Sequence, residues 1–201
     1  MPPPCYSPVT RACLAAVFLA IVSPAFSAQQ AELRIGLIGL DTSHVTAFTG
    51  VLNDPSHKDH IPGARVVGAF KGGSPDVVAS ATRIDGFTEE LVEKYGVKLY
   101  DTVEELAQNV DAIMIESVDA RVHLEQARRV FPFGKPVFID KPVAGSLRDA
   151  IEIYRLAEQH KAPVFSSSSL RYSRELAVVR QADVGSLLSA ISFGPATLEP
   201  H

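Results

Sequence analysis

From Glu32 to Phe165 the chain alternates between short apolar segments and longer segments with helical periodicity. The apolar segments predict buried strands, and the amphipathic segments between them predict helices. Strands that are apolar throughout and joined by helices are typical of a parallel sheet covered by helices on both faces. Because such crossovers are right-handed, the sequence predicts an α/β fold with a doubly wound, Rossmann-like parallel sheet. The expected strands cover residues 33–39, 64–70, 97–100, 111–115, 136–140 and 163–165.

The segments between these strands predict helices, and several carry a capping residue at their start. Ser146 precedes the clearest amphipathic segment, and Asp101 or Thr102 precedes another; Ser, Thr and Asp are favoured N-caps. The expected helices cover residues 42–52, 76–81, 88–95, 102–108, 121–131, 147–160 and 173–181.

The first 28 residues are predicted to be a signal peptide, which makes the protein exported, to the periplasm or the extracellular space. Arg11 precedes an apolar run, residues 12–22, and small residues follow it around Ser27 and Ala28. The run is shorter than the ~20 residues of a spanning helix, although an N-terminal membrane anchor is the alternative. No second long apolar segment follows, so we expect no membrane span after signal removal. Both cysteines, Cys5 and Cys13, lie in this segment.

The remaining composition limits the classes of function. The sequence has 19 basic and 23 acidic residues, which leaves no basic surplus to bind nucleic acid phosphates. Without a thiol after residue 28, the mature chain has no disulfide, no Cys nucleophile and no Cys metal site. His57 and His60 lie in a polar loop, where a solvated segment is favoured over a metal site. The sequence therefore predicts no metal site.

The pattern changes after Arg171. We predict a Rossmann-like domain over residues 29–171 and the start of an incomplete α/β second domain over residues 172–201. Residues 187–193 read as a strand, and a strand without partners cannot form a sheet of its own. The alternative is a strand added to the edge of the first sheet.

In a doubly wound sheet, ligands bind beyond the carboxyl ends of the strands. The first strand is followed by Gly39-Leu40-Asp41-Thr42-Ser43-His44, where a dinucleotide fingerprint would read G-x-G-x-x-G. Gly39 is the first glycine, but Asp41 and His44 occupy the other two positions. Asp41 or Thr42 instead suits a helix N-cap.

Two further loops carry polar residues at the expected carboxyl edge. Lys71 follows the second strand, where a basic residue tolerates the 2′-phosphate of NADP; a solvated loop lysine is the alternative. The serines 166–169 follow the sixth strand and suit either a ligand or a polar domain junction.

The most informative segment runs from Gly134 through a buried strand to Asp140-Lys141-Pro142. Upstream, a strand that begins at Asp111 leads through Ser117 to His123. In order and spacing these residues resemble the Gfo/Idh/MocA oxidoreductases, whose motif lysine follows a Gly-Lys strand ending in Glu-Lys-Pro. Here Asp140 replaces the glutamate. Tyr95-Gly96-Val97, Tyr100-Asp101 and Arg171-Tyr172 also match the pattern of the family, so the resemblance covers residues 33–194.

The resemblance implies an NADP- or NAD-dependent oxidoreductase that acts on a hydroxyl of a sugar or polyol, a small carbohydrate-like substrate. It makes Lys141 the catalytic residue, and we expect the amine of Lys141 to be partly desolvated because it follows a buried strand. The resemblance also implies a substrate domain beyond residue 201, through which a homo-oligomer could form, and without which this chain would be inactive. The expected cofactor-binding residues are Gly39, Asp41, Thr42, Ser43, Lys71, Ser117, His123, Asp140 and Lys141.

A second hypothesis assigns the chain to a class of proteins without enzymatic activity. The altered turn at Asp41 and His44, together with the predicted export, is also compatible with a non-catalytic exported binding protein that keeps the Rossmann scaffold without the dinucleotide.

Overall fold

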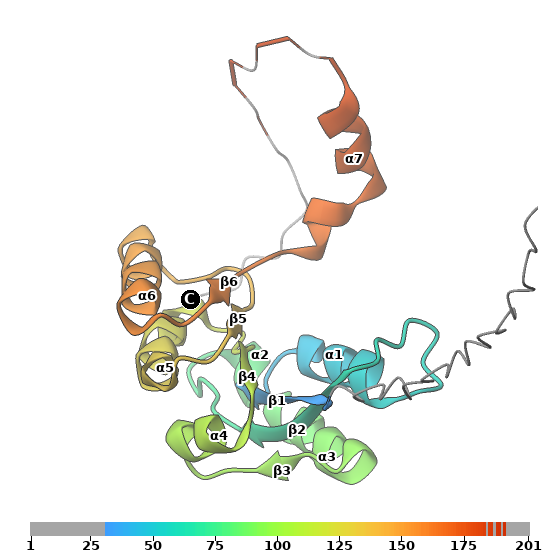
Figure 1. Cartoon of the computed structure of the whole chain (residues 1–201), viewed down its shortest axis with the longest axis vertical. Coiled ribbons are helices and arrows are strands. Elements are labelled where there is room, and N and C mark those ends of the chain that lie inside the picture. Colours follow the sequence, from blue (N-terminus) through green and yellow to red (C-terminus); the bar gives the residue numbers. More distant parts are fainter. Residues whose placement is uncertain (1–30, 184, 187, 190, 192–201) are drawn as a thin grey trace, which may run out of the picture. The chain divides into compact units, whose positions relative to one another are not determined.

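The computed structural model describes residues 31–183, 185–186, 188–189 and 191. Six parallel strands form one sheet in the order β3-β2-β1-β4-β5-β6 (Figure 1). This order confirms the predicted doubly wound sheet and places its topological switch point between β1 and β4. The strands are β1 (Leu33–Ile38), β2 (Ala64–Phe70), β3 (Lys98–Leu99), β4 (Ala112–Ile115), β5 (Val137–Ile139) and β6 (Val164–Phe165).

The register of the sheet brings the carboxyl ends of its four central strands into one row. Ile38, the last residue of β1, pairs with Phe70 of β2 and with Ile115 of β4. Ile115 in turn pairs with Ile139 of β5. The residues that directly follow these strands therefore lie side by side at one edge. They are Lys71, Gly39, Glu116 and Asp140.

The helices begin where the sequence offers capping side chains. Thr42, Thr102 and Ser146 each accept a hydrogen bond from a backbone N–H in the first turn of α1, α4 and α6. The helices are α1 (Ser43–Asn53), α2 (Val78–Ala81), α3 (Ile84–Tyr95), α4 (Val103–Asn109), α5 (His123–Val130), α6 (Leu147–His160) and α7 (Arg174–Gln181), with 3₁₀ turns η1 (Ala120–Val122), η2 (Phe131–Phe133) and η3 (Ser169–Tyr172).

Three expectations need correction or fall outside this description. The single helix expected over residues 121–131 is a 3₁₀ turn followed by α5, and α5 ends before Pro132, which lacks a backbone N–H. Helix α3 begins at Ile84, four residues before the expected start. The strand expected over 187–193 falls largely on residues that lie outside the described part of the chain.

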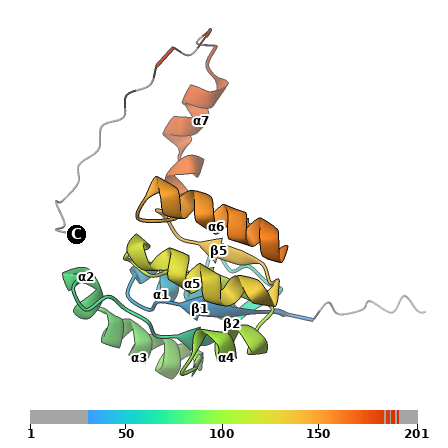
Figure 2. The same cartoon turned by 90° about the vertical axis from the view of Figure 1, so that its left-hand side faces the viewer.

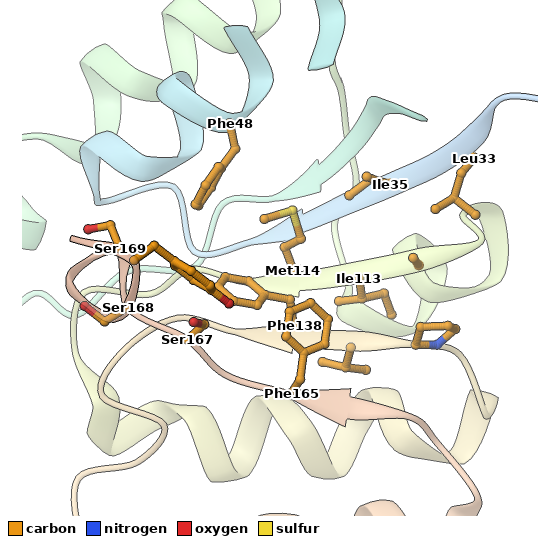
Figure 3. Close-up of a pocket in the computed structure, with 14 residues that line it drawn as sticks. Leu33, Ile35, Phe48, Ile113, Met114, Phe138, Phe165, Ser167, Ser168 and Ser169 are labelled. Carbon is orange, nitrogen blue, oxygen red and sulfur yellow. The ribbon is translucent and has the colours of Figure 1, made fainter. Parts of the chain in front are cut away.

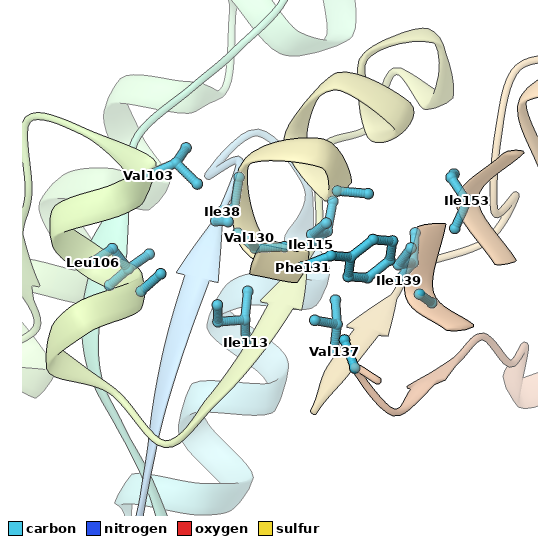
Figure 4. Close-up of a cluster of buried hydrophobic side chains, with 14 of the residues drawn as sticks. Ile38, Val103, Leu106, Ile113, Ile115, Val130, Phe131, Val137, Ile139 and Ile153 are labelled. Atoms are coloured by element: carbon cyan, nitrogen blue, oxygen red, sulfur yellow. The ribbon is translucent and has the colours of Figure 1, made fainter. Parts of the chain in front are cut away.

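The larger hydrophobic core fills the space between one face of the sheet and the helices α4, α5 and α6 (Figure 4). Phe131 and Ile153 are wholly buried there against residues of β4 and β5. Helices α5 and α6 lie side by side on this face (Figure 2). A smaller core, built around Leu37 and Leu91, packs the other face of the sheet against α1 and α3. No helix among the described residues is long and apolar enough to cross a membrane.

Helices cover both faces of the sheet, as predicted, but they leave one region of it exposed. On the face that carries α1, an apolar groove of about 560 Å³ runs along β1, β4, β5 and β6 (Figure 3). Phe138 lies at its centre, with ring centroids 6.1 Å from Phe48 and 5.2 Å from Phe165. None of the four residues that directly follow the central strands lines this groove.

Candidate functional site

The turn after β1 holds the first glycine of the fingerprint in a position that no other residue would occupy without strain. Gly39 has φ +84°, and a Cβ built on it would lie 2.1 Å from the Oγ of Ser117. Ser117 follows β4 directly after Glu116 and is buried. Gly39 is therefore required by the close approach of the chain segments that leave β1 and β4 at the switch point.

Asp41, at the second glycine position, is wholly buried and is not the helix cap. Thr42 caps α1 instead. The Asp41 carboxylate accepts hydrogen bonds from the backbone N–H of Val118 at 2.9 Å and from Ser80 Oγ at 2.6 Å. It thus joins the turn after β1 to the segment after β4 and to α2, and its charge is directed toward these two donors. Ser43 is the exposed first residue of α1.

Lys71 lies at the end of β2, as expected for a residue near a bound ribose. Its ammonium group lies 2.7 Å from a carboxylate oxygen of Asp85 in α3, and both side chains are exposed. The lysine is therefore at the predicted edge but is paired to a helix in this structure.

Three residues from distant parts of the sequence meet beside the lysine motif. His44 Nδ1 lies 2.7 Å from Asp140 Oδ2, so the first turn of α1 is joined to the end of β5. Glu116 completes the group, because one ligand-type atom from each of the three residues lies within 4.8 Å of the others. Glu116 is fully buried, and within the described part of the chain neither of its carboxylate oxygens has a hydrogen-bond partner. Burial, reinforced by the nearby charge of Asp140, raises the pKa of Glu116 to about 9.

His123 is also fully buried. Its Nε2 lies 2.8 Å from the carbonyl oxygen of Ser117, and its Nδ1 lies 3.3 Å from that of Val143. The imidazole thus links the segment after β4 to the segment after Lys141. The structure supports a positioning role for His123, and its direct contact with a cofactor stays a prediction.

Lys141 follows Asp140 at the same edge, where the sequence places it. The expected partial desolvation of its amine is wrong, because Lys141 is exposed. The strand β5 ends two residues earlier, at Ile139, so the lysine lies beyond the buried part of the sheet. Its side chain is accessible to a ligand at the carboxyl edge.

The weaker candidates lie elsewhere. The histidines of the loop after α1 bond locally: His57 Nδ1 accepts from the N–H of Asp59, and His60 Nδ1 lies 3.0 Å from the carbonyl oxygen of Val51. Ser168 caps η3, and serines 167–169 line the apolar groove. Neither set joins the carboxyl-edge row.

Glu116 is the residue that the sequence analysis did not select. One signal pointed to it: a carboxylate immediately after a wholly apolar strand, at the same position in its loop as Asp140. The partnership with His44 and Asp140 depends on the strand order, which brings positions 44, 116 and 140 together.

Comparison with known proteins agrees with this geometry. Residues 33–168 match the oxidoreductase family with an NAD-binding Rossmann fold, Gfo/Idh/MocA. The match covers more than half of the chain, and the chain belongs to this family. No curated protein matches the sequence.

Solved structures share the fold at low sequence identity. Myo-inositol 2-dehydrogenase from Lactobacillus plantarum is 20% identical with a TM-score of 0.57, over 75% of this chain and 40% of that one. Apo scyllo-inositol dehydrogenase from Lactobacillus casei is 19% identical with a TM-score of 0.56, over 76% of this chain and 41% of that one. The WlbA dehydrogenase from Bordetella pertussis, in complex with NADH and UDP-GlcNAcA, is 18% identical with a TM-score of 0.58, over 75% and 41%. The chain thus spans about two fifths of the length of these structures.

Proposed function

We propose that this chain is the dinucleotide-binding part of an NAD(P)-dependent oxidoreductase that acts on a hydroxyl of a sugar or polyol. The observation that carries the proposal is the placement of the Gly39 turn and Lys141 at one edge of a sheet with the order 3-2-1-4-5-6. Family membership and the inositol and sugar-nucleotide dehydrogenases of the same fold support the substrate class.

The residues at the switch point fit a dinucleotide. Gly39 and Gly72 lie against each other, since a Cβ on Gly72 would be 3.3 Å from the Gly39 Cα. The N-terminus of α1, with Thr42 and Ser43, would hold the pyrophosphate through its dipole and backbone amides. The charge of Asp41 is already compensated by two donors. Lys71 would lie near the ribose.

The chemistry assigned to the chain itself is proton handling at Lys141. A bound nicotinamide would supply hydride transfer to or from the carbinol carbon of the substrate. The Lys141 amine is exposed at the carboxyl edge, where it would hold or remove the proton of the substrate hydroxyl. Asp140 orients this segment through His44, and His123 fixes the segment that follows it.

Cofactor binding is tested by titrating NADH and NADPH into the 201-residue chain and following nicotinamide fluorescence. Ser43→Glu places a carboxylate at the start of α1, where it is compatible with the helix but repels a pyrophosphate, so we expect affinity to fall at least tenfold. Gln159→Glu, which adds the same charge at the exposed far end of α6, should change nothing. Lys71→Ala should lower the affinity for NADPH more than the affinity for NADH. Equal affinity in the Ser43→Glu variant would contradict the site.

The catalytic role is tested in the natural protein together with its substrate domain. Lys141→Met should reduce turnover by ~10²–10⁴. The free energy of unfolding should stay unchanged, because the side chain is exposed. Full activity in this variant would remove the catalytic assignment.

A non-catalytic exported binding protein is the second candidate. The observation that favours it is His44, whose ring occupies the third glycine position and bonds to Asp140. If neither the natural chain nor His44→Ala binds NADH or NADPH, this candidate replaces the first.

Export is part of both proposals. It rests on the signal-peptide pattern of residues 1–28, which lie outside the described residues. Expression with the natural N-terminus, followed by cell fractionation and N-terminal sequencing, should give a protein that begins near residue 29. An uncleaved N-terminus in the membrane fraction would favour an anchor instead.

A further inference from the structure

We propose that His44, Glu116 and Asp140 form a binding site for a first-row divalent cation, with Zn²⁺ as the best match. The site lies at the carboxyl ends of β4 and β5, against the first turn of α1. The site lies beside the predicted dinucleotide site and shares Asp140 with it, and it departs from the sequence-based expectation of no metal site.

The donor set and its spacing suit such a cation. One imidazole nitrogen and two carboxylate oxygens lie within 4.8 Å of one another. Zinc binds these atoms at about 2.0–2.2 Å, which places neighbouring ligand atoms of a tetrahedral site about 3.4 Å apart. The His44–Asp140 pair, at 2.7 Å, would open by less than about 1 Å to reach that spacing.

Glu116 supplies an independent observation that points to a ligand at this site. Its side chain is completely buried, and both carboxylate oxygens lack a hydrogen-bond partner among the described residues. A buried polar group without a partner costs several kcal/mol in a folded protein. The nearest ligand atoms, on His44 and Asp140, already bond to each other. A single cation between the three residues would satisfy all three at once.

Access and charge are consistent with this occupant. The His44 side chain is 35% exposed, so the site is open on one side while Asp140 and Glu116 form its buried floor. Two carboxylates and a neutral imidazole balance a divalent charge. Three protein ligands leave a fourth position for water or a ligand oxygen, which is the arrangement of catalytic rather than structural zinc sites.

The experiment uses the untagged 201-residue chain with Cys5→Ser and Cys13→Ser, so that no thiol competes for metal. After EDTA treatment and dialysis, isothermal titration with Zn²⁺ should give one equivalent, and Co²⁺ should give a visible absorption band. Mg²⁺ should not compete, because it prefers all-oxygen coordination. Glu116→Gln and His44→Gln should each weaken Zn²⁺ binding at least tenfold.

The control removes histidines that belong to the loop after α1. His57→Gln with His60→Gln should leave the affinity and the Co²⁺ spectrum unchanged. Urea unfolding of Glu116→Gln shows whether that variant is folded, so loss of metal can be separated from loss of structure. Failure of the natural chain to bind Zn²⁺, or unchanged binding by folded Glu116→Gln, would overturn the proposal, and either result leaves the NADH titration untouched.

Discussion

The amino and carboxyl edges of the sheet differ in how they place their charged and polar side chains. At the amino edge, Arg34 and Asp111 form a doubly hydrogen-bonded ion pair in solvent, at 2.8 and 3.0 Å. Lys135 donates to the carbonyl oxygens of Ala107, in the last turn of α4, and of Val110, which follows the helix. At the carboxyl edge, by contrast, the polar residues Asp41, Glu116 and Asp140 are buried.

Burial at the carboxyl edge is accompanied by incomplete hydrogen bonding. Both Glu116 oxygens and Ser74 Oγ, which lie at this edge, are among the buried side-chain atoms without a partner in the described chain. An unpaired buried carboxylate such as that of Glu116 does not stabilise the fold, whereas the binding of a ligand at this edge would explain why it is present. The amino edge thus pairs its charged groups in solvent, whereas the carboxyl edge holds buried groups that either join segments of the fold, as Asp41 does, or lack a partner among the described residues, as Glu116 does.

The largest expected effect on stability tests the close approach of Gly39 to Ser117 at the switch point. Gly39→Ala combines a left-handed backbone with a Cβ 2.1 Å from Ser117 Oγ and 2.7 Å from its Cα, so we expect it to lower the free energy of unfolding by about 4 kcal/mol. Urea denaturation measures this change.

Gly63→Ala is the matched control at the amino edge. Gly63 has φ +93°, but nothing lies within 4 Å of its Cβ position. The backbone cost alone should be about 1 kcal/mol. Similar losses in the two variants would show that the close approach to Ser117 does not contribute.

The next effect concerns the buried carboxylate. The pKa of Glu116 rises from 4.5 to about 9 on folding, so between these values the folded state binds one proton more than the unfolded state. Its contribution to stability is fully present below pH 4.5 and is lost as pH rises toward 9. At pH 7 the loss is about 3 kcal/mol, from 1.36 kcal/mol per pH unit.

Glu116→Gln keeps the neutral shape and removes this dependence. In EDTA, urea unfolding at pH 5, 7 and 9 should show the variant gaining stability over the natural chain as pH rises. Glu89→Gln, on the exposed face of α3, should follow the natural chain at every pH. A variant that is less stable at pH 7 would show that the carboxylate is stabilised by its surroundings.

A smaller effect is expected at Asp41. Asp41→Ala leaves the partly buried N–H of Val118 and the buried hydroxyl of Ser80 without their acceptor, which should cost about 2 kcal/mol. Asp41→Asn keeps one acceptor oxygen and should cost less. If both variants unfold like the natural chain, the bridge between the turn and α2 does not stabilise the fold.

The sheet was predictable because each strand is apolar throughout and each helix follows with its own cap. Ser146 fixed the start of α6, which the structure places at Leu147–His160, as expected. The exposed groove was not predictable, since Phe138 and Phe165 have the same apolar character as residues that face a helix. Local sequence indicates burial, but it does not indicate which part of the chain covers a strand.

For the site, the sequence predicted which residues follow the strands, but it did not predict which of them bond to one another. Lys71, Gly39 and Lys141 lie at the edge where the topology rule places them. The bonding partners were not predictable, because His44–Asp140 spans 96 residues and Asp41–Val118 spans 77. Asp41 was expected to cap α1 or to bind the cofactor, whereas in the structure its carboxylate accepts a hydrogen bond from the segment after β4.

The smallest effect on the free energy of unfolding is expected at the amino edge, from the Arg34–Asp111 pair. Arg34 holds the pKa of Asp111 well below its usual range, at about 2, mainly through hydrogen bonds. The pair therefore contributes stability above pH 3.8 that is lost as pH falls toward 2. Because the side chains are 52% and 36% exposed, solvent screening limits the contribution to less than about 1 kcal/mol. Asp111→Asn should lower the free energy of unfolding by this amount at pH 7, and 1 M NaCl should reduce the difference further. A loss as large as that of Asp41→Ala, insensitive to salt, would mean that the amino edge depends on its charges as much as the carboxyl edge does.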